Sequence, residues 1–122
     1  MQVTEQVPSE SRLNSDRERV LDQIAELERE FTAIAASAAD GSSGSDDEHD
    51  PEGATVAFER QHIAALLAQA RSHLDAIDAA LRKVDSGVYE ICDICGCPIG
   101  AERLAARPAA LTCVRCAGKQ RQ

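Results

Sequence analysis

Four cysteines near the end of the chain have the type and spacing of metal ligands: Cys92, Cys95, Cys113 and Cys116. They form two C-x-x-C pairs, and seventeen residues separate the pairs. A two-residue gap lets two thiolates from one tight turn bind the same tetrahedral ion, and the second pair completes a closed shell. The spacing therefore predicts one structural Zn²⁺, with two disulfides or free thiols as the alternatives.

The segment that carries these cysteines, residues 87–122, has few large apolar side chains. A segment under about 40 residues rarely folds on such a core without a metal or disulfides. Zinc binding would therefore supply folding free energy. Four thiolates leave no open coordination position, and no histidine occurs in this segment. Both features favour a structural metal over a catalytic one.

A fifth cysteine, Cys97, follows the first pair in the sequence Cys95-Gly96-Cys97. Its one-residue gap does not match the spacing of the two pairs. We expect a spare thiol close to the metal. The alternative is redox sensing, in which Cys97 reacts when zinc is lost.

The chain of 122 residues has a formal net charge of −8, and the charge is unevenly placed. Its first half is strongly acidic, whereas from Arg103 onward five basic residues occur and no acidic one. This balance argues against a protein that reads duplex DNA with a strongly basic face. No stretch has the apolar length of a membrane span, and the start MQVTEQVPSE lacks the features of a signal peptide. With unpaired thiols around a metal, these features predict a cytoplasmic protein.

Two long segments have apolar residues at alternating spacings of four and three, which is typical of a coiled-coil seam. The first helix is expected to begin near Ser9 and to end at Asp40-Gly41, and the second to run from about Ala54 to Ser86, with Gly87 as its cap. Arg17 interrupts the first seam. The seam residues are Leu13, Val20, Ile24, Leu27, Phe31, Ile34 and Ala38, then Ile63, Leu67, Ala70, Leu74, Ile77, Leu81 and Val84.

The connection between the helices is short, so we expect each seam to be buried against the other in an antiparallel hairpin, with Leu27 near Leu67. The predicted fold is all-α: a long antiparallel coiled-coil hairpin and a small C-terminal four-cysteine zinc finger with short helices. Its parts are a disordered N-terminus (1–8), the hairpin (9–86) with a tip loop (41–53), and the finger with a short tail (87–122). We expect a monomer, and a four-helix bundle formed by two chains is the alternative.

The tip loop is strongly acidic. Such a run is usually a solvated loop, and we expect its histidine, His49, to be exposed rather than a ligand. Its predicted place at the far end of a long hairpin favours a role in contacting a partner. Five carboxylates lie within seven residues: Asp46, Asp47, Glu48, Asp50 and Glu52.

The stretch CDICGCPIGAERLAARPAALTCVRC, residues 92–116, resembles the zinc-finger signature of the DksA/TraR family of bacterial transcription regulators, and specifically its actinobacterial type. The preceding Gly87-Val88-Tyr89 and the long hairpin match as well. The resemblance implies a regulator that binds RNA polymerase directly, without DNA. Its hairpin would enter the secondary channel of the polymerase, so that the tip approaches the catalytic Mg²⁺ region and alters initiation.

The resemblance also implies which residues contact partners. The family's tip pattern Asp-x-x-Asp-x-Ala is matched only approximately, since Glu52 stands where alanine is expected, or else Gly53 stands where the second aspartate is expected. Arg107 matches an arginine that helps to bind guanosine tetraphosphate, but Ala76 and Ala117 stand where further basic partners are expected. The alternative is that Arg107 braces the finger against the second helix. The implied tip contacts are Asp46, Asp47, Asp50, Glu52 and Ala54.

Two other functions stay open at this point. The same architecture would serve a zinc-finger adaptor on another protein. Alternatively, the basic end would make a nucleic-acid-binding finger, with salt-sensitive affinity through Arg103, Arg107, Arg115, Lys119 and Arg121. An enzyme is not expected, because the sequence has no nucleophile–base pair, no phosphate loop and no open metal site.

Overall fold

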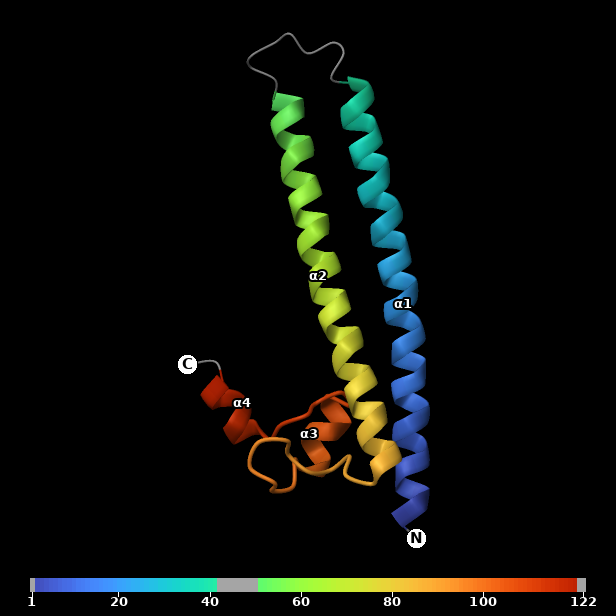
Figure 1. Ribbon diagram of the computed structural model, residues 1–122, viewed down its shortest axis with the longest axis vertical. Coiled ribbons are helices and arrows are strands. Elements are labelled where there is room, and N and C mark those ends of the chain that lie inside the picture. Colours follow the sequence, from blue (N-terminus) through green and yellow to red (C-terminus); the bar gives the residue numbers. More distant parts are fainter. Residues whose placement is uncertain (1, 42–50, 121–122) are drawn as a thin grey trace. The chain divides into compact units, whose positions relative to one another are not determined.

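The computed structural model describes residues 2–41 and 51–120 (Figure 1). Its elements, in chain order, are the helices α1 (Gln2–Gly41), α2 (Pro51–Ser86), α3 (Ala101–Ala106) and α4 (Val114–Gln120). An isolated antiparallel β-bridge joins Ile91 and Pro98. Both long helices pass through two compact units, one formed by Val20–Arg71 and the other by Met1–Arg19 with Ser72–Gln122.

The unit Val20–Arg71 is a pair of antiparallel helices with a narrow apolar seam. Val20 and Leu27 of α1 are buried, as are three residues of α2: Ile63, Leu67 and Ala70. Beside the seam, Arg71 Nη2 lies 2.7 Å from Glu28 Oε2. This ion pair joins α1 to α2 beside the seam.

In the other unit, the same two helices pack through Leu13 and Ile77, both fully buried. Arg17, which interrupts the apolar pattern of α1, donates from Nε to Asp78 Oδ1 at 2.6 Å. The interruption is therefore a polar pair between the helices. Such a pair favours one register of the seam over its neighbours.

Near its end, α2 is covered on more than one side, because the consecutive residues Lys83 and Val84 are both buried. Consecutive helical positions point about 100° apart, so no single neighbouring helix covers both. The seam shifts accordingly: Ala80 is fully buried, whereas Leu74 and Leu81 are only half-buried.

The predicted all-helical fold is confirmed, with a long helical hairpin followed by a four-cysteine segment that has two short helices. Two helix starts differ from the expected ones. Helix α1 begins at Gln2 rather than near Ser9, so residues 2–8, expected to be disordered, are helical. A proline within a helix removes one backbone hydrogen bond and crowds the carbonyl four residues earlier, but here the helix continues through Pro8.

Helix α2 begins at Pro51 rather than Ala54, so the last part of the expected loop 41–53 is helical. Proline is favoured at the first position of a helix, where its missing N–H would have no partner. Among the helices of residues 2–41 and 51–120, none combines the length and apolarity that a membrane span requires.

Gly87 ends α2 as expected. Its φ of +77° lies in the left-handed region that glycine adopts without steric strain. Its N–H donates to the carbonyl of Val84 at 3.1 Å, and the N–H of Val88 donates to the carbonyl of Lys83 at 2.9 Å. These two bonds form a Schellman motif, which turns the chain sharply from the helix into the cysteine-rich segment.

Candidate metal centre

The first cysteine pair lies in a tight turn closed by backbone hydrogen bonds. The N–H of Cys92 donates to the carbonyl of Cys97 at 2.8 Å, and the N–H of Gly96 donates to the carbonyl of Cys92 at 3.1 Å. Gly96 has a φ of +76°, which favours glycine at this position. The N–H of Ile94 also faces the Cys92 sulfur at 3.4 Å. The turn therefore directs backbone donors at a sulfur atom.

The second pair lies at the start of α4. Cys113 directly precedes the helix, and Cys116 lies in its first turn. The N–H of Ala117 donates to the carbonyl of Cys113 at 2.9 Å, which holds the two cysteines one helical turn apart. Side chains separated by three residues share one face of a helix, so both thiols can point the same way.

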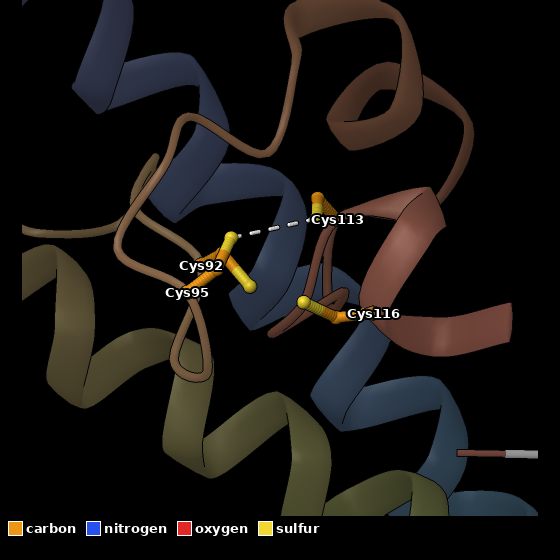
Figure 2. Close-up of side chains that lie close together, drawn as sticks. All are labelled: Cys92, Cys95, Cys113 and Cys116. Atoms are coloured by element: carbon orange, nitrogen blue, oxygen red, sulfur yellow. Dashed lines mark hydrogen bonds between the residues drawn. The ribbon is translucent and has the colours of Figure 1, made fainter. Parts of the chain in front are cut away.

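The two turns bring four sulfur atoms together, as Figure 2 shows. The Sγ atoms of Cys92, Cys95, Cys113 and Cys116 all lie within 4.8 Å of one another, and those of Cys95 and Cys113 are 3.8 Å apart. All five cysteines are free thiols, so the disulfide alternative does not describe this structure. Cys97 is exposed and lies outside the cluster. Four converging thiols are the donor set that Zn²⁺ takes in closed structural sites.

The thiols of the cluster differ in acidity. Hydrogen bonding from the backbone amide of Cys95, with smaller contributions from those of Cys113 and Ile94, lowers the pKa of Cys92 to about 6. Burial raises the pKa of Cys116 to about 12. In this geometry, before a metal binds, Cys92 therefore loses its proton more readily than Cys116 does. Zinc uptake must displace the proton of Cys116, because the thiolate is the ligand.

Four further hydrogen bonds hold the segment between the two turns. The backbone N–H groups of Asp93 and Ile99 donate to the carbonyls of Leu111 (2.9 Å) and Glu90 (2.7 Å). Arg103 Nε donates to the carbonyl of Thr112 at 2.8 Å. The hydroxyl of Tyr89, a buried residue, donates to the carbonyl of Pro108 at 2.7 Å. These bonds fix backbone on both sides of the cysteines.

Two basic residues of the long helices bind this segment, and sequence reasoning assigned neither of them a role. Arg12 of α1 donates from Nη1 to the carbonyl of Ala105 at 2.7 Å, across 93 residues of sequence. Lys83 of α2 donates from Nζ to the carbonyl of Ile91 and pairs with Asp93 Oδ1 at 2.9 Å. No spacing rule links such distant residues.

The partner-contact residues expected from the sequence lie elsewhere in the chain. Arg107 is exposed at the end of α3, where its N–H donates to the carbonyl of Arg103 at 2.7 Å. Asp46, Asp47, His49 and Asp50 lie outside the described residues. Glu52 and Ala54 belong to α2, and Ala54 is exposed.

Comparison with known proteins identifies the cysteine-rich segment. Residues 87–122 match the family of the prokaryotic dksA/traR C4-type zinc finger. The C-terminal segment of the chain is therefore a zinc finger of the DksA/TraR C4 type. As a C4-type finger, the DksA/TraR segment binds one zinc ion through its four-cysteine cluster, which confirms the predicted cofactor.

The chain is similar to two curated bacterial proteins, among others. One is the Haemophilus influenzae protein named RNA polymerase-binding transcription factor DksA, 44% identical over 46 residues, which are 38% of this chain and 32% of the relative. Another is the Bacillus subtilis protein YteA, 39% identical over 66 residues, which are 54% of this chain and 28% of YteA. The chain thus spans about a third or less of the length of these curated relatives.

A solved structure extends the similarity beyond the finger. Transcription factor DksA2 from Pseudomonas aeruginosa is 28% identical, with a TM-score of 0.51, over 91% of this chain and 84% of that one. Because it covers 91% of the chain, this similarity includes the long helices. The actinobacterial type stays a prediction.

Proposed function

We propose that this protein is a transcription regulator that binds RNA polymerase and has no catalytic activity of its own. The observation that carries the proposal is a DksA/TraR finger continuous with a long helical hairpin, similar to transcription factor DksA2 over 91% of the chain. A relative that is 44% identical over 46 residues is named an RNA polymerase-binding transcription factor. Such a regulator works in the cytoplasm.

In the proposed mechanism, different regions of the protein provide affinity for the polymerase and the effect on initiation. The hairpin and the finger provide surface for binding the polymerase. The acidic connection between α1 and α2, with Asp46, Asp47 and Asp50, enters the secondary channel together with Glu52 and Ala54 at the start of α2. Carboxylates placed near a catalytic Mg²⁺ act through their charge, because bound cations dominate the local electrostatics of such a site. A small contact area at the tip therefore suffices to change initiation.

The experiment measures polymerase binding and in vitro transcription for the same variants. The tip variant carries Asp47→Asn, Asp50→Asn and Glu52→Gln. The control variant removes the same charge from exposed acids of α1, with Asp22→Asn, Glu26→Gln and Glu30→Gln. We expect the tip variant to bind the cognate polymerase but to lose its effect on transcription, and the control to keep both.

Two outcomes would contradict the proposal in different ways. If the tip variant regulates transcription as the parent does, the acidic connection is a solvated loop. If the parent does not bind polymerase, the zinc-finger adaptor becomes the better account. Binding to nucleic acid alone, weakened steeply by salt, would favour the finger with its exposed Arg107, Arg115 and Lys119 as a nucleic-acid module.

The same experiment also measures the response to guanosine tetraphosphate. We propose that Arg107, exposed beside the end of α3, contacts guanosine tetraphosphate at the polymerase interface. Arg107→Ala is expected to remove any response to the nucleotide while leaving polymerase binding intact. An unchanged response would exclude this role for Arg107.

A further inference from the structure

Lys83 is a charged residue in the last turn of α2, yet it is only 9% exposed. A buried ammonium is tolerated when it is paired and hydrogen-bonded. Here its Nζ donates to the carbonyl of Ile91 and lies 2.9 Å from Asp93 Oδ1. Ile91 and Asp93 stand on either side of Cys92 in the sequence. One ammonium group therefore holds the chain before and after a zinc ligand.

Asp93 links Lys83 to the backbone that precedes the second cysteine pair. Its carboxylate pairs with Lys83, and its backbone N–H donates to the carbonyl of Leu111 at 2.9 Å. Leu111 lies two residues before Cys113. A continuous set of contacts thus runs from the end of α2, through Asp93, to the backbone of both cysteine turns.

The backbone of Lys83 makes a separate hydrogen bond at the end of α2. Its carbonyl accepts the N–H of Val88 at 2.9 Å, and this bond spans more residues than the other bond of the Schellman motif that ends α2 at Gly87. The same residue therefore closes the helix with its carbonyl and holds the first cysteine turn with its ammonium group.

We propose that Lys83 is a positioning residue for the zinc site and couples zinc binding to the order of the last turn of α2. Groups that hold metal ligands from behind orient them, and their loss typically lowers metal affinity 10–100-fold. Coupling is reciprocal, so bound zinc must stabilise the helix end as much as the helix end favours zinc.

The test measures zinc affinity of the full chain by competition with a chelator of known affinity. Lys83→Met keeps the apolar stem and removes the charge, and we expect it to weaken zinc binding about 10–100-fold. Lys83→Arg keeps a cation with several donors and should restore part of the loss. Arg82→Met is the matched control, because Arg82 is the exposed neighbour in the same helical turn; it should leave zinc affinity unchanged.

A second measurement separates coupling from general stabilisation. In the parent, removal of zinc should raise hydrogen exchange at the amide of Val88. In Lys83→Met, exchange at this amide should be high with or without zinc. A residue that is merely structural would leave the difference between zinc-loaded and zinc-free protein as it is in the parent.

Asp93→Asn tests the contacts that run from Lys83 through Asp93 to the cysteine turns. This variant can be measured even if Lys83→Met does not fold. It should weaken zinc binding, and in combination with Lys83→Met the two effects should be less than additive, because both remove one ion pair. Parent-like zinc affinity in Lys83→Met or in Asp93→Asn, or fully additive losses, would overturn the proposal.

Discussion

The zinc finger and the helical unit Val20–Arg71 are held together in different ways. In the helical unit, buried side chains are spread along a seam at spacings of three, four or seven residues within each helix: Val20, Leu27, Ile63, Leu67 and Ala70. In the finger, the buried residues are few: Tyr89, Cys92, Ile99, Leu104 and Cys116. Two of them, Cys92 and Cys116, are metal ligands. The stability of the helical unit therefore depends on many small contributions from buried side chains, whereas that of the finger depends on one large contribution from zinc binding.

This difference determines how each region responds to damage. Loss of one seam residue removes a share of the buried area and leaves the rest of the seam in place. Loss of one ligand opens the metal site, and with it goes the binding free energy that folds the finger. We therefore expect gradual effects from mutations in the helical unit and near-complete effects from mutations at the cysteines.

The largest effect is expected from Cys116→Ser. It removes a buried ligand, so zinc should be lost and the finger should unfold, whereas most of the helical circular dichroism signal should remain. Elemental analysis of freshly reduced protein measures the metal. Cys97→Ser is the control and should retain one zinc per chain, because Cys97 is exposed and outside the cluster. Zinc loss in the Cys97 variant, or full retention in the Cys116 variant, would contradict the assignment of ligands.

A second large effect is expected from pH, and only on the finger. Protons compete with zinc for the thiolates, so apparent zinc affinity should fall as pH falls. Because ordinary cysteine thiols are largely protonated at pH 7 and burial raises the pKa of Cys116 to about 12, uptake near pH 7 should release protons, that of Cys116 among them. Calorimetry in buffers of different ionisation enthalpy counts the protons. Release of none would show that all four sulfurs are already ionised, contrary to this account.

Effects of intermediate size are expected in the seam. Leu13 is fully buried and Leu67 is 6% exposed, so Leu→Ala at either should lower the free energy of unfolding by about 2–5 kcal/mol. Phe58→Ala is the control, because Phe58 is 75% exposed and should contribute little. Chemical denaturation at saturating zinc measures all three variants. A large loss at Phe58 would favour the alternative in which a second chain buries it.

The smallest effect is expected for the ion pair Arg17–Asp78. Both side chains are partly exposed, at 40% and 33%, and such pairs contribute roughly 0.2–1 kcal/mol. A double-mutant cycle with Arg17→Met and Asp78→Asn measures the coupling, which should shrink as salt is added. A coupling several times larger would mean that this pair, rather than the apolar seam, dominates the stability of its unit.

The sequence allowed much of the fold and of the candidate site to be predicted, because both follow local rules. Spacings of three and four predict seam positions such as Leu13 and Leu67, which are buried. The two C-x-x-C pairs predict a four-cysteine cluster, which the structure contains. Gly87 predicts the end of α2 because a left-handed residue there favours glycine.

The contacts that hold the site in place were not predictable in this way. Arg12 binds the carbonyl of Ala105 across 93 residues, and Lys83 is buried because the finger's backbone covers the last turn of α2. A lysine in the last turn of a helix normally indicates only a favourable interaction with the helix dipole. Its pairing with Asp93 depends on the turn that the cysteines make, which no periodicity encodes.

Residue-resolved amide exchange of the full chain, with zinc and after its removal by a chelator, tests the central comparison most directly. The account predicts that zinc removal raises exchange at amides of the finger, such as Cys92, Ile99 and Leu104, and leaves Leu67 and Ala70 protected. Retained protection in the zinc-free finger would show that its apolar core suffices. Equal loss of protection in both regions would show that zinc holds the helical unit as well, and either result would contradict the account.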